Sequence, residues 1–175
     1  NLNTVAIRFP KHKMIRAILK RINFPLAMPS ANKSTKVSPV SSIDVYDEFK
    51  KKIKIIINGG KCKIGLESTV VDLSESIKIL RPGYVSLNDI KKTLKKKVII
   101  SKNQKKIIAP GMMKLHYSPG IPVVLNQKKA GKNVAFITFG KKYSYINNNF
   151  NLSKKSNLHE AARNLYKVLR KIKNM

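Results

Sequence analysis

The chain has 175 residues, enough for one full domain or for a partial domain with an extension. Its composition, 42% hydrophobic and 26% charged, is typical of a soluble globular protein, and no apolar run approaches the roughly 18 residues of a membrane span. A single cysteine excludes an internal disulfide and favours a reducing compartment, for which the cytoplasm is the simplest expectation.

The charge is extreme, because 37 Lys and Arg stand against 8 Asp and Glu and give a formal net charge of +29. This excess indicates a polyanionic partner such as tRNA. Most of the cations are lysines spread along the chain, as an AT-rich genome also produces, so both interpretations stay open. Where Lys is the default cation, Arg indicates a need for a planar, bidentate fork. The arginines are Arg8, Arg16, Arg21, Arg81, Arg163 and Arg170.

Strands and helices alternate in the predicted first part of the chain. The apolar alternation of residues 4–9 predicts a strand whose Thr4 and Arg8 point the same way. Helical spacing follows over residues 11–22, and a short buried strand is expected at 26–28. Ser41 with Asp44 predicts a helix that runs to about Lys52, and strands are expected at 53–57, 66–73 and 77–80. A second cap, at Ser86 with Asp89, predicts another helix.

The second part of the chain begins with two Pro-Gly pairs in reversed order over residues 109–120, which indicate a linker or lid. Strands are expected at 123–125 and 134–139, and a final helix capped by Asn157 and Glu160 follows, with an apolar face of Leu158, Ala161, Leu165, Leu169 and Ile172. The predicted organisation is an α/β sheet domain over 1–108, a linker over 109–120, and the start of a small α/β domain over 121–175.

Several classes of chemistry are excluded by the motifs. Histidines and Cys62 lack metal-ligand spacing, and no nucleophile elbow, Walker loop or dinucleotide fingerprint is present. Glu67 and Asp72 would lie on opposite faces of an alternating strand, so they offer no carboxylate pair. What remains are hydroxyls, amides and arginines at the predicted ends of strands, which suit phosphate and carboxylate groups. Each has an ordinary structural explanation when taken alone.

Taken in order, these segments resemble a known family. The blocks TVAIR (4–8), PSANKSTKVSP (29–39), GGKCKIGLESTVVDL (59–73), ILRPG (79–83) and PGMMKLHYSP (110–119) are similar to those of the YrdC-like threonylcarbamoyl-AMP synthases. The resemblance is to the two-domain members, and it covers nearly the whole chain. It implies an open, twisted α/β sheet domain, present here in part, then a linker and a partial Rossmann-like α/β domain.

The resemblance implies an enzyme that joins L-threonine, bicarbonate and ATP into threonylcarbamoyladenylate and releases pyrophosphate. A tRNA-modifying threonylcarbamoyl transferase complex would then pass the group to adenosine 37 of tRNAs that read ANN codons. The site implied has no protein nucleophile and no protein-bound metal, because Mg²⁺ would ride on the triphosphate. No membrane is implied.

Residue by residue, the resemblance implies two sets of ligands. Thr4, Asn32, Arg81 and Tyr117 would bind ATP, together with the backbone of Val40, where the family often has Thr. A second set would bind L-threonine: Arg8, Ser30 and Ser68. Ser38 and Pro39 would shape the wall of this loop.

Besides Val40, one further departure from the family and two alternative functions accompany this interpretation. The family's catalytic domain begins earlier and carries a Lys-x-Arg motif that grips the ATP phosphates. No such motif stands at that place here, so we expect the chain alone to be inactive. One alternative is a non-catalytic YrdC-like module that binds RNA through its basic surface. The other is a carbamoyl-adenylate enzyme of hydrogenase maturation, against which the single cysteine argues.

Overall fold

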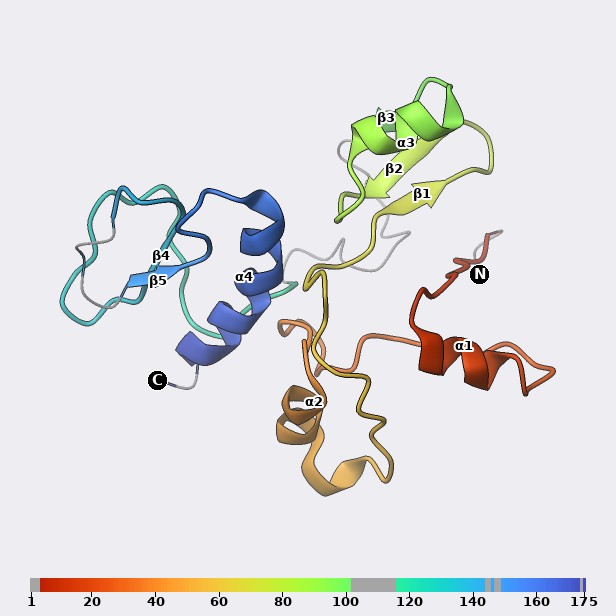
Figure 1. Cartoon of the computed structure of the whole chain (residues 1–175), viewed down its shortest axis with the longest axis horizontal. Helices are drawn as coiled ribbons and strands as arrows, with labels where there is room; N and C mark the ends of the chain where they lie inside the picture. The colour runs from red at the N-terminus through yellow and green to blue at the C-terminus, as the bar shows by residue number, and fades with distance from the viewer. Residues whose placement is uncertain (1–3, 102–115, 144–145, 147–148, 174) are drawn as a thin grey trace.

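The computed structural model describes residues 4–101, 116–143, 146, 149–173 and 175. These residues form a mixed α/β structure, as the sequence predicts, with a three-stranded sheet, a two-stranded sheet and four α-helices. The strands β4 and β5 and the helix α4 lie at one end of the long axis, and α1 lies at the other (Figure 1). The predicted linker at 109–120 is described only from residue 116 onward.

The three-stranded sheet is formed by residues 70–100, in the middle of the sequence. Strand β1 (Val70–Asp72) pairs antiparallel with β2 (Lys78–Arg81), which pairs in parallel with β3 (Ile99–Ile100). Helix α3 (Leu87–Leu94) connects β2 to β3 and begins at the predicted capping box of Ser86 and Asp89. The side chain of Ile79, on β2, is 2% exposed and anchors this small core.

Two helices lie N-terminal to this sheet. Helix α1 (Lys13–Leu19) is shorter than the predicted 11–22 and buries none of its residues. Helix α2 (Ser42–Phe49) continues into the 3₁₀ turn η1 (Lys50–Lys52), which confirms the predicted helix. The hydroxyl of Ser41 accepts from the backbone N–H of Asp44 at 3.3 Å, so the expected cap is formed.

The C-terminal part consists of one long helix beside two short parallel strands. Strand β4 (Phe136–Thr138) pairs with β5 (Asn149–Asn151), which the sequence did not predict, and α4 (Leu158–Lys173) follows. The N–H of Glu160 donates to the side chain of Asn157 at 2.9 Å, as expected of a cap. Helix α4 buries Tyr166 and Ile172, whereas Leu158, predicted on its apolar face, is 74% exposed.

Four predicted strands are wrong. The structure has no strand at 4–9, 26–28, 53–57 or 123–125, although all four segments belong to the described residues. Val5, Ile7 and Phe9, which alternate in the sequence, are 81–90% exposed. A strand exists only when its backbone groups are paired with a neighbour, and none of these segments pairs within the part of the chain that the structure describes. Alternation within a segment does not show whether a partner strand is available.

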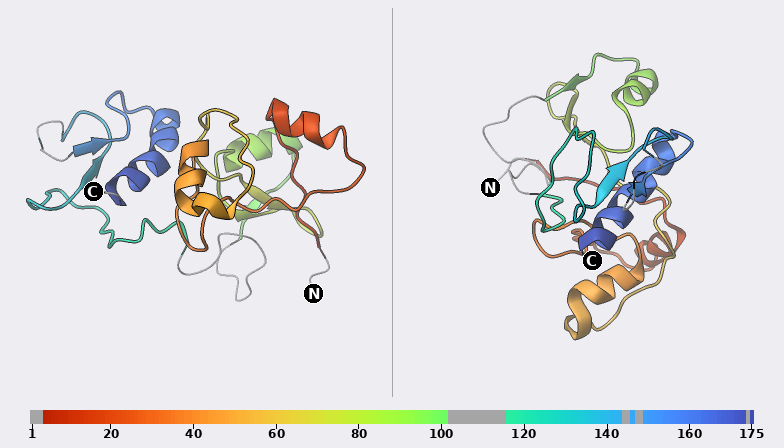
Figure 2. Two further views of the ribbon diagram at one scale, coloured as in Figure 1. Left: turned by 90° about the horizontal axis from the view of Figure 1, so that it is seen from below. Right: turned by 90° about the vertical axis from the view of Figure 1, so that its left-hand side faces the viewer.

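The molecule is open rather than compact, as its spread of elements shows in two further views (Figure 2). The chain exposes 14456 Å², whereas a compact monomer of its 19.8 kDa would expose about 8,600 Å². Much apolar surface therefore stays in contact with solvent, and the exposed large hydrophobic side chains are spread along the chain, from Val5 to Met175. Among the described residues, no helix combines the length and the apolar character needed to cross a bilayer.

The burial of Ile79 and the exposure of Ile7 give a matched pair of substitutions. Replacing Ile79 with Ala should lower the free energy of unfolding by about 2–4 kcal/mol, because a fully buried side chain leaves a cavity. The same change at Ile7 should cost less than about 0.5 kcal/mol. Chemical denaturation of both variants measures the difference. An equal loss in the free energy of unfolding for Ile7→Ala would show that Ile7 is packed, as the predicted strand at 4–9 requires.

Candidate functional site

The side chain of Arg81 joins two other predicted site residues, Ser68 and Tyr117. Arg81 ends β2 and is 9% exposed. Its Nε and Nη2 donate to the carbonyl of Ser68 at 3.1 and 2.8 Å, and Nη2 also donates to the Ser68 hydroxyl at 3.2 Å. Its Nη1 donates to the Tyr117 hydroxyl at 3.1 Å. The planar fork thus joins Ser68 and Tyr117, which lie 49 positions apart in the sequence, whereas a lysine would offer only a single point charge.

Burial raises the pKa of the Tyr117 phenol, partly offset by the neighbouring Arg81 guanidinium. Tyr117 stacks on Tyr166 of α4, with ring centroids 5.9 Å apart and planes tilted by 27°. Burial also raises the pKa of Tyr166, and the charge of Glu67 acts in the same direction on both phenols. Both hydroxyls therefore stay protonated at neutral pH and can donate or accept hydrogen bonds.

The loop at 32–38 lies beside this cluster and is organised around two side chains. Asn32 donates from its amide to the carbonyls of Lys33 and Lys36, at 2.9 and 3.0 Å. The buried hydroxyl of Ser38 lies 3.4 Å from the Asn32 amide oxygen and 2.5 Å from the Glu67 carboxylate. Asn32 and Ser38 therefore connect the loop to the segment that carries Ser68.

Two glycines permit the close approach of backbone segments around the site. A Cβ on Gly83 would lie 2.4–2.5 Å from backbone atoms of Glu67, Ser68 and Thr69. Gly65, at φ +77°, lies against the backbone of Arg163 in α4, where a Cβ would come within 2.7 Å of the carbonyl oxygen. Close main-chain packing at Gly83 and Gly65 thus fixes the position of the segment that carries Ser68.

The predicted site residues fall into two groups. Ser68, Arg81 and Tyr117 come together, and Asn32 joins them through Ser38. Thr4, Arg8 and Ser30 lie at exposed positions, and the described residues show no hydrogen bond or ion pair from them to this cluster. Because 4–9 is not a strand, nothing aligns Thr4 with Arg8 as the sequence predicted.

Val40 occupies neither group, because its backbone is engaged elsewhere. Its N–H donates to the Asp44 carboxylate at 2.9 Å, and its carbonyl accepts from the N–H of Cys62 at 2.9 Å. A backbone contact from Val40 to a nucleotide would need this bond to Asp44 to open. The ligand assignments of all the predicted site residues, those of the cluster included, stay predictions.

Sequence reasoning missed Glu67 and Tyr166. Glu67 was set aside because alternation placed it opposite Asp72, but β1 begins only at Val70, so alternation does not apply at residue 67. Tyr166 sits at helical spacing between the apolar positions of α4, and that spacing was the signal that could have found it. Both lie near Tyr117 and shape its electrostatic environment.

Family models match both parts of the chain. The model of the Sua5–YciO–YrdC family, described as telomere recombination, matches residues 1–83. The model of the C-terminal domain of threonylcarbamoyl-AMP synthase matches residues 85–174. The chain belongs to this family. The two matches meet near residue 84, and the predicted boundaries at 108 and 120 stay predictions.

Curated relatives carry the same name. The threonylcarbamoyl-AMP synthase of Pyrococcus abyssi is 36% identical over 97% of this chain and 55% of its own length. That of Bacillus subtilis is 30% identical over 97% of this chain and 54% of its own length. The chain therefore spans about half the length of the curated relatives it matches.

Solved structures of this family agree with the fold. The crystal structure of P. abyssi Sua5 complexed with L-threonine superposes with a TM-score of 0.77 at 30% identity, over 99% of this chain and 56% of that one. A variant of the same protein, in which a consecutive His-Tyr pair is replaced by alanines, gives a TM-score of 0.75 at 29% identity, over 99% of this chain and 55% of that one.

The raised pKa of Tyr117 predicts a late titration. Its phenol should ionise above the ordinary value of about 10, so Tyr117→Phe should remove tyrosinate absorbance only above that pH. Because folding raises this pKa, its contribution to stability is complete below pH ~10 and is lost as pH rises through the folded value. An early loss of absorbance in Tyr117→Phe would contradict this burial.

Proposed function

We propose that this chain forms part of an L-threonylcarbamoyladenylate synthase, an enzyme that uses L-threonine, bicarbonate and ATP. The observation that carries the proposal is the convergence of Ser68, Arg81 and Tyr117 beside the Asn32–Ser38 loop, in a member of this family. A relative that binds L-threonine in its crystal supports the amino-acid substrate. A His-Tyr pair, His116 and Tyr117, stands here next to Arg81, and the alanine variant of such a pair in the relative supports its inclusion in the site.

The chemistry proposed needs positioning more than a protein nucleophile. The carbamate of threonine attacks the α-phosphorus of ATP, its P–O bond forms, and the bond to pyrophosphate breaks. Negative charge builds on the phosphoryl oxygens, so cations and hydrogen-bond donors that are already oriented lower the barrier. Arg81 is such a donor, since its partners hold the guanidinium in place.

The ligand assignments keep the predicted division. Ser68 and Ser30 are proposed to hold threonine, with Arg8 on its carboxylate. Asn32, Arg81 and Tyr117 are proposed to contact ATP, with Thr4 and the backbone of Val40. In the described part of the chain, no cluster of three or more His, Cys, Asp or Glu side chains is placed to hold a metal. Mg²⁺ is therefore proposed to arrive bound to the triphosphate.

The product is a mixed anhydride that water hydrolyses, so a consumer is required. A threonylcarbamoyl transferase complex that modifies adenosine 37 of tRNA is proposed as the partner. The net charge of +29 supports a direct contact with RNA. A purely RNA-binding role is the second candidate, and the same charge is the observation that favours it.

The enzyme proposal predicts threonine-dependent pyrophosphate release by the full-length product of the gene that encodes this chain. With ATP, bicarbonate and Mg²⁺ present, Arg81→Ala and Arg8→Ala should each lower the rate about 100-fold or more, as loss of an oriented cation does. Arg21→Ala, which removes an exposed arginine of the same N-terminal region, serves as the control. Folded protein that shows no release, together with RNA binding that weakens steeply with salt, would favour the second candidate.

A further inference from the structure

We propose that Arg170 of helix α4 is a positioning residue that, together with Glu48, holds the loop at 32–38 in shape. The role of this loop in substrate binding rests on the proposed function, whereas the hold itself rests on contacts alone. Arg170 belongs to the part of the chain matched by the C-terminal domain, and the loop belongs to the part matched by the other family model. The inference therefore makes the C-terminal domain a support of the candidate site.

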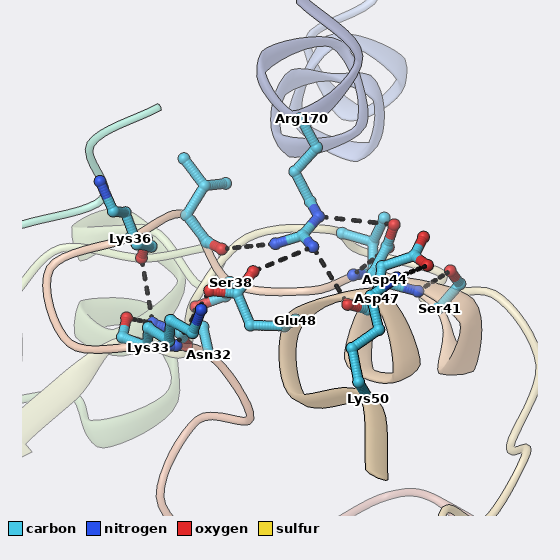
Figure 3. Close-up of polar contacts among 12 residues, drawn as sticks. Asn32, Lys33, Lys36, Ser38, Ser41, Asp44, Asp47, Glu48, Lys50 and Arg170 are labelled. Carbon is cyan, nitrogen blue, oxygen red and sulfur yellow. Dashed lines mark hydrogen bonds and ion pairs between the residues drawn. The ribbon is translucent and has the colours of Figure 1, made fainter. Parts of the chain in front are cut away.

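Arg170 reaches from α4 to acceptors on three residues of the other part. Its Nη1 donates to the carbonyl of Val37 at 3.0 Å, and its Nη2 donates to the carbonyl of Asp44 at 3.1 Å. Ion pairs join its Nε to the Asp44 carboxylate at 3.4 Å and its Nη2 to that of Glu48 at 3.3 Å (Figure 3). The side chain is 16% exposed, so these contacts are shielded from water.

Glu48 extends this hold to the start of the loop. While its Oε2 pairs with Arg170, its Oε1 accepts from the backbone N–H of Lys33 at 3.2 Å. The Glu48 side chain is 5% exposed. A buried carboxylate that loses its cation is costly, so removal of Arg170 should displace Glu48 as well. One guanidinium thus acts on the loop directly at Val37 and through Glu48 at Lys33.

The linker holds the same loop from the other side. The N–H of Val37 donates to the carbonyl of Ser118 at 3.2 Å, and the N–H of Ser118 donates to Thr35 at 2.8 Å. Within the loop, Asn32 and Ser38 are then oriented by their contacts with Lys36 and Glu67. The held backbone therefore sets the direction of the Asn32 amide, which is the proposed contact to ATP.

Tyr166 makes the arrangement a two-point contact. It lies four residues before Arg170, so both side chains project from the same face of α4. Tyr166 stacks on Tyr117, which is bonded to Arg81, while Arg170 holds the loop. A single helix thus contacts both halves of the candidate site.

Amide hydrogen exchange on the full chain tests the hold without any substrate. In Arg170→Ala and in Glu48→Gln, exchange of the Lys33 N–H should accelerate about tenfold or more, because its charged acceptor is lost or displaced. Arg170→Lys should give an intermediate rate, since it keeps the charge but not the fork. Lys167→Ala removes a cation at an exposed position of the same helix and should change the rate less than about twofold.

The Lys95 amide, which donates to the Lys91 carbonyl at the end of α3, serves as the internal reference. Exchange that rises at Lys33 alone supports the hold. Unchanged exchange at Lys33 in both Glu48→Gln and Arg170→Lys, or an equal rise at Lys95, overturns it. If Arg170→Ala does not fold, the other two variants still decide.

Steady-state kinetics of the full-length product then test the consequence for the site. A positioning role predicts that Arg170→Lys and Glu48→Gln raise the KM for ATP about tenfold, with a smaller change in kcat. The control Lys167→Ala should change neither kcat nor the KM for either substrate. Loss of protein through instability would lower kcat and leave KM unchanged, which would contradict positioning. If the wild type releases no pyrophosphate with threonine, the proposed function fails, while the exchange rates still decide the role of Arg170.

Discussion

The hydrogen bonds of Arg81 are the interaction on which the arrangement of the site depends. Through this guanidinium, the end of β2, the segment at Ser68 and the segment at Tyr117 share one donor group. Tyr117 passes the contact on to Tyr166 of α4 by stacking. A cation that is 9% exposed needs such partners, because an uncompensated buried charge would be expelled to solvent. The need of the buried Arg81 guanidinium for acceptors therefore also brings Ser68 and Tyr117 together.

The acidic residue near this cation gives the site its electrostatic balance. Glu67 raises the pKa of both tyrosines, whereas Arg81 lowers it, and burial dominates over both. The phenols consequently remain neutral hydrogen-bonding groups. Ser38 meets Glu67 with its hydroxyl, so the carboxylate is directed toward the loop as well as the tyrosines. These groups offer a cation, hydroxyls and an amide, which are the donors and acceptors that the proposed function requires.

Local signals in the sequence predicted the helices well. The caps at Ser41, Ser86 and Asn157 each carry their own hydrogen bond within one turn, so no distant residue is needed to form them. The strands at 70–72 and 78–81 were found for the related reason that they pair with each other across a short connection. The segment at 4–9 has an equally clear pattern, but pairing is a long-range property that alternation does not encode.

The sequence placed in one site those residues that both belong to the motif blocks and contact one another in the structure. Ser68, Arg81 and Tyr117 come together although 49 positions separate the first from the last, because the ordered blocks of the family carry this long-range information. Helix α4 contributes through single side chains. The helical spacing of Tyr166 could have placed it on the buried face, but nothing in the local pattern of Arg170 distinguishes it from ordinary helix residues. The role of each side chain follows from the residue that it contacts, which is Tyr117 for Tyr166 and Val37 for Arg170.

The two glycines of the motif blocks explain why those blocks keep their form. Gly83 admits the backbone of residues 67–69, and Gly65 admits the backbone of α4 at Arg163. Neither contact involves a substrate, yet each one determines where Ser68 and Arg170 can lie. A larger residue at Gly65 would push α4 away, and with it both Tyr166 and Arg170. In this chain, the glycines next to the hydroxyl and arginine positions are therefore packing constraints through which the C-terminal helix reaches the site.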